Sequence, residues 1–155
     1  MSAARQITFH VVGTPVSAGS HKAFVFRRDG KTHARVTHAS SKTAPWMDSI
    51  AHEASRHVSE VTRSAVELEL QFVFVRPRSH YRSGRSTGHL LTSAAPRGHT
   101  RKPDLDKLCR CVSDGLTGVV WADDSQVVRL CAAKKYGQQE GVTVTIREVC
   151  EDDDG

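Results

Sequence analysis

The chain has 155 residues, a formal net charge of +5 and a sequence pI near 9.3. This length suits one compact domain with a single hydrophobic core. No stretch approaches the roughly 18 apolar residues that a membrane-spanning helix needs, and the N-terminus lacks the apolar run of a signal peptide. We therefore expect a cytoplasmic protein that does not span a membrane. The positive charge fits a polyanionic partner, although many basic proteins never bind nucleic acid.

Two strand patterns occupy the beginning of the chain. Residues 7–12 have the two-residue alternation of a strand with one buried face. Residues 24–27 and 32–36 flank a short segment that contains Asp29 and Gly30. An Asp-Gly pair supplies the positive backbone dihedrals that a tight hairpin turn requires. The sequence therefore predicts a first strand and then a hairpin.

A helix and a strand follow the hairpin. Thr43, followed closely by a proline, marks a helix start, and apolar residues at helical spacing carry that helix to about Glu60. Residues 66–74 alternate between apolar and polar side chains more regularly than any other segment, which predicts a strand. Residues 76–102 have no apolar period, and a loop of this length is usually functional or disordered.

The C-terminal part predicts one more helix and two closing strands. Leu105, Leu108, Cys109, Val112 and Leu116 form the apolar stripe of a helix that faces a core. Strands are predicted from residues 126–135 and 142–147, and residues 151–155 form an acidic tail. Together the elements predict a single α+β domain with a mixed or antiparallel sheet and two main helices.

Charge is distributed unevenly along this order of elements. Residues 76–102 contain seven Lys or Arg and no acidic residue, whereas eleven of the 17 acidic residues follow from position 103 onward. A basic segment therefore runs directly into the acidic part of the chain. We expect the chemistry of the protein at that junction.

Carboxylates gather where the predicted loop becomes a helix. Pro103 keeps its neighbour extended, so Asp104 stands at the helix start and Asp106 in the first turn. Two side chains at this spacing face the same way only if the first residue is extended and the second is helical. Asp106 and Arg110 then share a polar helix face, and Asp124, the second of an Asp pair, comes just before a predicted strand.

These acids allow two interpretations. Acids in a first helical turn are favoured by the helix dipole, and Asp pairs are common in turns, so the residues could be structural. Several carboxylates brought together repel one another, a cost that a divalent cation removes. Oxygen ligands favour Mg²⁺ or Mn²⁺ over Zn²⁺. The four cysteines are expected to stay as reduced thiols, and His99 is expected to lie outside a metal site.

Three blocks of sequence follow one another in the order D-x-D, D-x-L and D-D-x-Q-V. They are Lys102-Pro103-Asp104-Leu105-Asp106-Lys107-Leu108, Asp114-Gly115-Leu116-Thr117-Gly118 and Trp121-Ala122-Asp123-Asp124-Ser125-Gln126-Val127. Their combination resembles the signature of the RusA family of Holliday junction resolvases. Pro15-Val16-Ser17-Ala18-Gly19-Ser20 and Pro45-Trp46 also resemble phage and prophage members, which extends the similarity to about residues 6–149.

The resemblance implies a RusA-like endonuclease domain over residues 1–150. It makes Asp104, Asp106 and Asp124 the catalytic and metal-binding carboxylates, with Asp123 only a neighbour. The catalytic-site lysine of the family falls on Arg110, which keeps a permanent charge for phosphate but is not a group that changes protonation. Lys107 stands where the family usually has Asn. The predicted DNA-binding residues are Arg97, Arg101, Lys102 and Lys107.

The implied function is a Mg²⁺-dependent endodeoxyribonuclease that resolves four-way DNA junctions by paired symmetric nicks. The resemblance also implies a homodimer that acts in DNA recombination, DNA repair or phage DNA processing. Two alternatives stay open. The protein could bind junctions without cutting them, or it could be a metal-dependent nuclease that acts on other branched nucleic acids.

Overall fold

The computed structural model describes residues 5–19, 22–37, 41–84 and 90–150, with the backbone alone for 22–28 and 33–37. A four-stranded sheet has the order β1-β6-β4-β5. Its strands are β1 (Gln6–Val12), β4 (Val66–Val75), β5 (Val127–Gly137) and β6 (Gly141–Glu148). β6 pairs antiparallel with β1 and β4, whereas β4 and β5 are parallel. The predicted α+β fold is confirmed, and its sheet is mixed.

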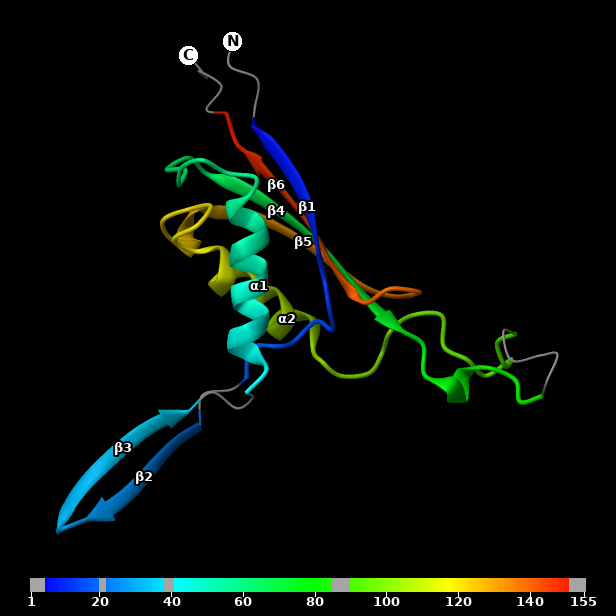
Figure 1. The fold of residues 1–155 in the computed structure, drawn as a ribbon, viewed down its shortest axis with the longest axis horizontal. Helices are drawn as coiled ribbons and strands as arrows, with labels where there is room; N and C mark the ends of the chain where they lie inside the picture. Colours follow the sequence, from blue (N-terminus) through cyan, green and yellow to red (C-terminus); the bar gives the residue numbers. More distant parts are fainter. Residues whose placement is uncertain (1–4, 20–21, 38–40, 85–89, 151–155) are drawn as a thin grey trace.

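Two helices, α1 (Thr43–Ser55) and α2 (Leu105–Leu116), cover one face of the sheet (Figure 1). The alternation of β4 places five apolar side chains on the covered face, and all of them are buried: Val66, Leu68, Leu70, Phe72 and Phe74. From α2, the side chains of Leu108, Val112 and Leu116 are fully buried against this face and α1. Each fully buried Leu contributes about 1.5–3 kcal/mol relative to an exposed one.

The first helix ends earlier than the sequence predicts. α1 stops at Ser55 rather than near Glu60. The amides of Arg56 and His57 bond to carbonyl groups three residues earlier, at 3.1 and 3.0 Å. Such bonds tighten and close the last turn of a helix. Val58 still packs against the core, which explains why the helical spacing continued past the true end.

The strand predicted from Gln126 begins one residue later, at Val127. Gln126 is the last residue of the short 3₁₀ helix η2 (Asp124–Gln126), and both polar atoms of its side chain form hydrogen bonds. Oε1 accepts hydrogen bonds from the amides of Ala122 and Asp123, at 2.8 and 3.0 Å. Nε2 donates to two carbonyl groups in the segment before β4, those of Thr62 and Ser64. Gln126 therefore holds the turn that precedes β5.

Two segments project from this body (Figure 1). One is the predicted hairpin, β2 (Lys22–Arg28) and β3 (Lys31–Thr37), in which Asp29 and Gly30 have φ values of 52° and 73° as the Asp-Gly prediction requires. The other follows β4 and contains the 3₁₀ helix η1 (Arg78–His80). The acidic tail at 151–155 lies outside the described residues. Within the described part of the chain, no helix is long and apolar enough to span a membrane.

Candidate active site

Asp104 and Asp106 lie at the corner where the basic loop becomes α2. Asp104 occupies the N-cap position with an extended backbone, φ −72° and ψ 139°, and Asp106 lies in the first helical turn. This is the backbone arrangement predicted from the sequence. The Asp104 side chain makes no capping hydrogen bond. Its Oδ2 atom lies 3.4 Å from Nζ of Lys107, in an ion pair that is largely exposed.

Asp124 is held by three side-chain donors. The Ser113 hydroxyl and the Trp121 indole nitrogen donate to Oδ1, each at 3.0 Å, and the Thr117 hydroxyl donates to the same oxygen. Within the described part of the chain, no hydrogen bond reaches Oδ2. Burial acts to raise the pKa of Asp124, but the three hydrogen bonds outweigh it and hold the pKa below its usual value. Asp124 is therefore an oriented carboxylate that stays ionised, with one oxygen available.

Asp123, the other member of the pair, has a structural role. Its carboxylate accepts a hydrogen bond of 2.8 Å from the amide of Ser125, which caps η2. Hydrogen bonding to the side chain of Ser125, and then to its amide, lowers the pKa of Asp123. The side chain of Gln126 completes a capping box by bonding to the Asp123 amide. The two neighbouring acids thus differ, because Asp123 supports the turn and Asp124 faces the groove described next.

An open groove of about 780 Å³ runs between α2 and β5. Asp106 and Arg110 line it from α2, and Asp124 lines it from the turn before β5. Apolar side chains of α2, β4 and β5 form most of the rest of its wall: Leu68, Leu105, Cys109, Val127, Leu130 and Ala132. The groove brings together two of the three predicted carboxylates and the predicted phosphate-binding cation.

The third carboxylate, that of Asp104, stands beside the groove rather than in its lining. Among the residues described, no three His, Cys, Asp or Glu side chains are grouped closely enough to hold a metal ion. The available groups are carboxylate oxygens, and Oδ2 of Asp124 is free of hydrogen bonds from the described residues. This donor chemistry fits a hard divalent cation, and gathering all three carboxylates would require Asp104 to leave Lys107.

Softer metal ligands near the groove are unsuited to that role. Burial raises the pKa of both Cys109 and Cys111 to about 11, so these side chains are neutral thiols at physiological pH. Cys109, Cys111 and Cys131 form no disulfide bond within the described part of the chain. His99 stacks against Phe74 and Tyr136, with ring centroids 4.3 and 4.9 Å away. The His99 ring is therefore part of an aromatic cluster with Phe74 and Tyr136.

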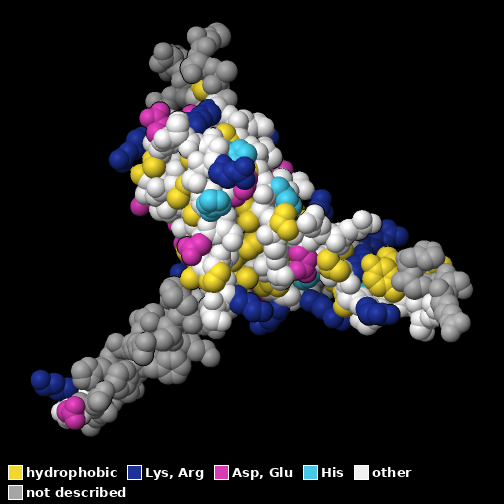
Figure 2. Space-filling view, viewed as in Figure 1, with side chains coloured by type: hydrophobic (Ala, Val, Ile, Leu, Met, Phe, Trp, Pro, Cys, Tyr) yellow, Lys and Arg dark blue, Asp and Glu magenta, His cyan; other side chains and the backbone are white. Residues whose placement is uncertain are grey.

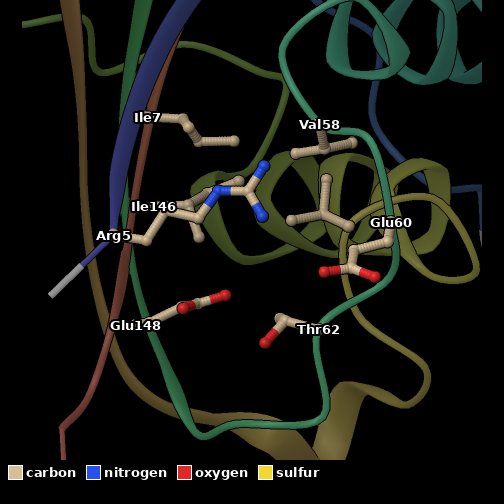
Figure 3. Close-up of a pocket in the computed structure, with 8 residues that line it drawn as sticks. Arg5, Ile7, Val58, Glu60, Thr62, Ile146 and Glu148 are labelled. Carbon is tan, nitrogen blue, oxygen red and sulfur yellow. The ribbon is translucent and has the colours of Figure 1, made fainter. Parts of the chain in front are cut away.

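A second pocket lies elsewhere, between the β1–β6 edge of the sheet and the segment that follows α1 (Figure 3). Arg5 reaches into it, with Glu60 and Glu148 nearby (Figure 3). Its enclosed volume is only about 10 Å³, which is room for about one water molecule. This pocket is too small for a nucleotide and shares no lining residue with the groove.

The predicted DNA-binding residues Arg97, Arg101 and Lys102 are exposed. Figure 2 shows that Lys and Arg side chains gather on the segment that projects after β4 and along the adjoining edge of the body. That segment also has a hollow of about 450 Å³ lined by Arg78 and Arg82 with Tyr81 between them. Both arginines belong to the predicted basic segment, but the sequence did not single them out as DNA ligands.

The residues that orient Asp124 were not found from the sequence. Ser113, Thr117 and Trp121 are spread over α2 and the turn that follows it, and their convergence on one oxygen depends on the fold. The sequence contained one indication of this role, because Thr117 and Trp121 lie inside the recognised blocks that also contain the acids.

Comparison with known proteins identifies the family of this chain. Residues 14–147 match the family described as Endodeoxyribonuclease RusA, which covers the groove and all three carboxylates. The chain belongs to the RusA family. It is also 32% identical over 147 residues to the uncharacterized protein YqaN of Bacillus subtilis strain 168, a match that covers 92% of this chain and 96% of that protein. The RusA assignment makes the protein an enzyme of the endodeoxyribonuclease class.

Proposed function

We propose that this RusA-family protein is a Mg²⁺-dependent endonuclease, also able to use Mn²⁺, that resolves four-way DNA junctions by paired symmetric nicks. The observation that carries the proposal is the groove in which Asp106, Asp124 and Arg110 meet. Carboxylates suit a divalent cation, and a neighbouring guanidinium suits phosphate, which is the combination that phosphodiester hydrolysis requires.

In the proposed mechanism, Asp104, Asp106 and Asp124 hold the cation. A divalent cation supplies positive charge that polarises the scissile phosphate and makes water a better nucleophile. Arg110 stabilises the negative charge that develops on the phosphoryl oxygens. Asp124 needs little reorganisation on binding, because its three donors already fix Oδ1 and leave Oδ2 for the ligand. Asp104 would then bind the cation in place of its exposed ion pair with Lys107.

The basic segment would hold DNA beside this groove. Arg97, Arg101 and Lys102 precede Asp104 directly, so phosphates bound there would lie next to the carboxylates. Arg78 and Arg82 stand farther out on the projecting segment and would contact a neighbouring part of the same DNA. Branched DNA is proposed as the substrate because the chain belongs to the RusA family.

We further propose that the active form is a homodimer, because symmetric nicks in two strands need two active sites. Among the described strands, β5 lies at the edge of the sheet with β4 as its one neighbour, and it exposes 62% of Val128 and 52% of Leu130. Exposed apolar side chains on an open sheet edge are a usual feature of a surface that is covered in an assembly. Light scattering of the purified protein measures the assembly state directly.

The decisive experiment incubates the protein with a labelled four-way junction in Mg²⁺ or in EDTA. We expect paired nicks at symmetric positions in Mg²⁺ and none in EDTA. Asp124→Asn is the matched control, because it keeps the shape of the side chain and removes its charge. A shifted band without nicks would instead identify a junction-binding protein. Faster cutting of flaps or RNA would identify a nuclease for other branched nucleic acids.

A further inference from the structure

Lys134 of β5 reaches the segment that leads into the active site. Its register partner on β4 is the fully buried Phe72, so Lys134 lies on the helix-covered side of the sheet. Nζ donates hydrogen bonds to the carbonyl oxygens of Arg101, at 2.8 Å, and Pro103, at 2.9 Å. Hydrogen bonds from a charged donor are about twice as strong as neutral ones. The second carbonyl belongs to the residue directly before Asp104.

These bonds connect the two halves of the proposed metal site. Asp124 lies in the turn from which β5 starts, whereas Asp104 belongs to the corner before α2. The Asp104 side chain has no capping bond that would fix it locally, and its ion pair with Lys107 is largely exposed. β5 is therefore attached to both carboxylates, to Asp124 through the chain and to Asp104 through Lys134.

Other contacts dock the same loop on the ends of β4 and β5. Arg76 donates to the carbonyl oxygens of Pro96, at 2.7 Å, and Arg97, at 3.3 Å. Its guanidinium lies 4.3 Å from the ring centroid of Tyr136, which is two residues beyond Lys134. Hydrogen bonds from Arg76 and Lys134 thus hold the loop over residues 96–103, and the bond from Lys134 to Pro103 is the last of them before Asp104.

We propose that Lys134 is a positioning residue, which sets Asp104 relative to Asp124 and so determines how tightly the site binds a divalent cation. This inference rests on the proposed function. Lys134 directs its hydrogen bonds at backbone carbonyls, and its role is to orient a ligand-bearing corner. The support of metal ligands by such outer contacts typically accounts for about 10–100-fold in metal affinity.

The neighbouring residue provides a matched control. Lys135 lies on the opposite face of β5, where its Nζ donates to the side-chain oxygen of Gln71 at 3.2 Å. K135M therefore removes the same charge from the same strand without touching the corner before α2. K134R is the conservative variant, since a guanidinium also offers several donors for two carbonyl groups.

The test measures Mn²⁺ binding to the DNA-free protein by calorimetry, together with hydrogen exchange of the first turn of α2. In this turn the amide of Leu108 bonds to the carbonyl of Asp104 at 3.1 Å. We expect K134M to weaken Mn²⁺ binding by about tenfold or more and to speed exchange in this turn. K135M should change neither property, and K134R should recover part of the loss in both.

Equal Mn²⁺ affinity and equal exchange in K134M and K135M would overturn the inference. It would also be overturned if K134M bound Mn²⁺ normally but lost DNA affinity with a salt slope smaller by about 0.9, because Lys134 would then be a phosphate ligand. A parent protein that binds Mn²⁺, responds to K134M as expected and cuts no DNA would refute the proposed function alone. A parent that binds no Mn²⁺ would refute both.

Discussion

The indole nitrogen of Trp121 donates a hydrogen bond of 3.0 Å to Oδ1 of Asp124. The Trp121 side chain is completely buried, so the hydrophobic core reaches directly to a carboxylate of the proposed metal site. A carboxylate held this way keeps its orientation before any ligand arrives, which is what a preorganised site requires. The roles of the residues around it lead to the following predictions.

Asp104→Asn, Asp106→Asn and Asp124→Asn should each abolish cleavage of a junction in Mg²⁺. Each variant removes a proposed cation ligand, and each also removes a negative charge near DNA, so junction binding should be retained or become tighter. Cleavage and gel-shift assays on one substrate separate the two effects. Asp48→Asn, on the exposed surface of α1, is the charge-matched control, and Asp123→Asn should keep measurable cleavage. Efficient nicking by one of the three variants would remove that residue from the site.

Ser113→Ala should move the acid limb of the pH–rate profile to higher pH. The Ser113 hydroxyl is one of the donors that outweigh burial and lower the pKa of Asp124, so its loss lets that pKa rise. A carboxylate with a lowered pKa stabilises the fold above its ordinary pKa, and this contribution disappears as the pH falls through the folded value. The free energy of unfolding of the variant should therefore differ from that of the parent least at the most acid pH, whereas the cleavage rates should differ most on the acid limb. Ser49→Ala on α1 is the control, and an unmoved limb would show that Asp124 does not govern the profile.

Arg110→Ala should reduce the single-turnover cleavage rate by about a hundredfold or more, with a much smaller effect on binding. This is the scale of removing one group that stabilises the transition state. Arg110→Lys should remain active if charge alone is needed, and should fail if a bidentate guanidinium interaction is required. Arg56→Ala, at the end of α1, removes an exposed arginine far from the groove and should leave the rate unchanged. If Arg110→Ala cleaved at the rate of the parent protein, Arg110 would be only a solvent-exposed helix residue without a role in catalysis.

Replacing Arg97, Arg101 and Lys102 together by Gln should weaken binding to every DNA. It should also lower the slope of log affinity against log salt by about 0.9 for each phosphate that the variant no longer neutralises. The backbone ties of this loop to Arg76 and Lys134 use carbonyl oxygens, so they survive the change of side chains. Arg129→Gln, which removes an arginine from the far face of the sheet, is the control. A triple variant with the parental slope would mean that the loop does not touch phosphate.

Lys107→Asn should lower the Mg²⁺ concentration that gives half-maximal cleavage by about two- to fivefold, the scale of an exposed ion pair. The substitution releases Asp104 from its 3.4 Å ion pair with Lys107, so that ammonium group no longer competes with the divalent cation for the carboxylate. Titration of cleavage with Mg²⁺ measures the change. A higher Mg²⁺ requirement would instead indicate that Lys107 assists the site by binding phosphate.

Local patterns in the sequence determined most of the secondary structure. The alternation of residues 66–74 and the apolar stripe of α2 each depend on the spacing of side chains within one element. The Asp29-Gly30 pair depends only on the backbone dihedrals of its own turn. The three acidic blocks determined the family for a related reason, since spacing along the chain is enough to recognise them. These features can be predicted without knowing which segments pack against each other in the folded chain.

The resemblance already distinguished Asp123 from Asp124, but only the tertiary structure shows the contacts that make the two acids different. Asp123 and Asp124 are adjacent and chemically identical, yet one caps η2 and the other faces the groove, because their partners come from different segments. The parallel pairing of β4 with β5 sets β5 and the turn before it beside α2, and Lys134 ties β5 to the start of that helix. Hydrogen bonds and packing between segments distant in the chain leave no periodic pattern in the sequence, so these relations emerge only when the chain is folded.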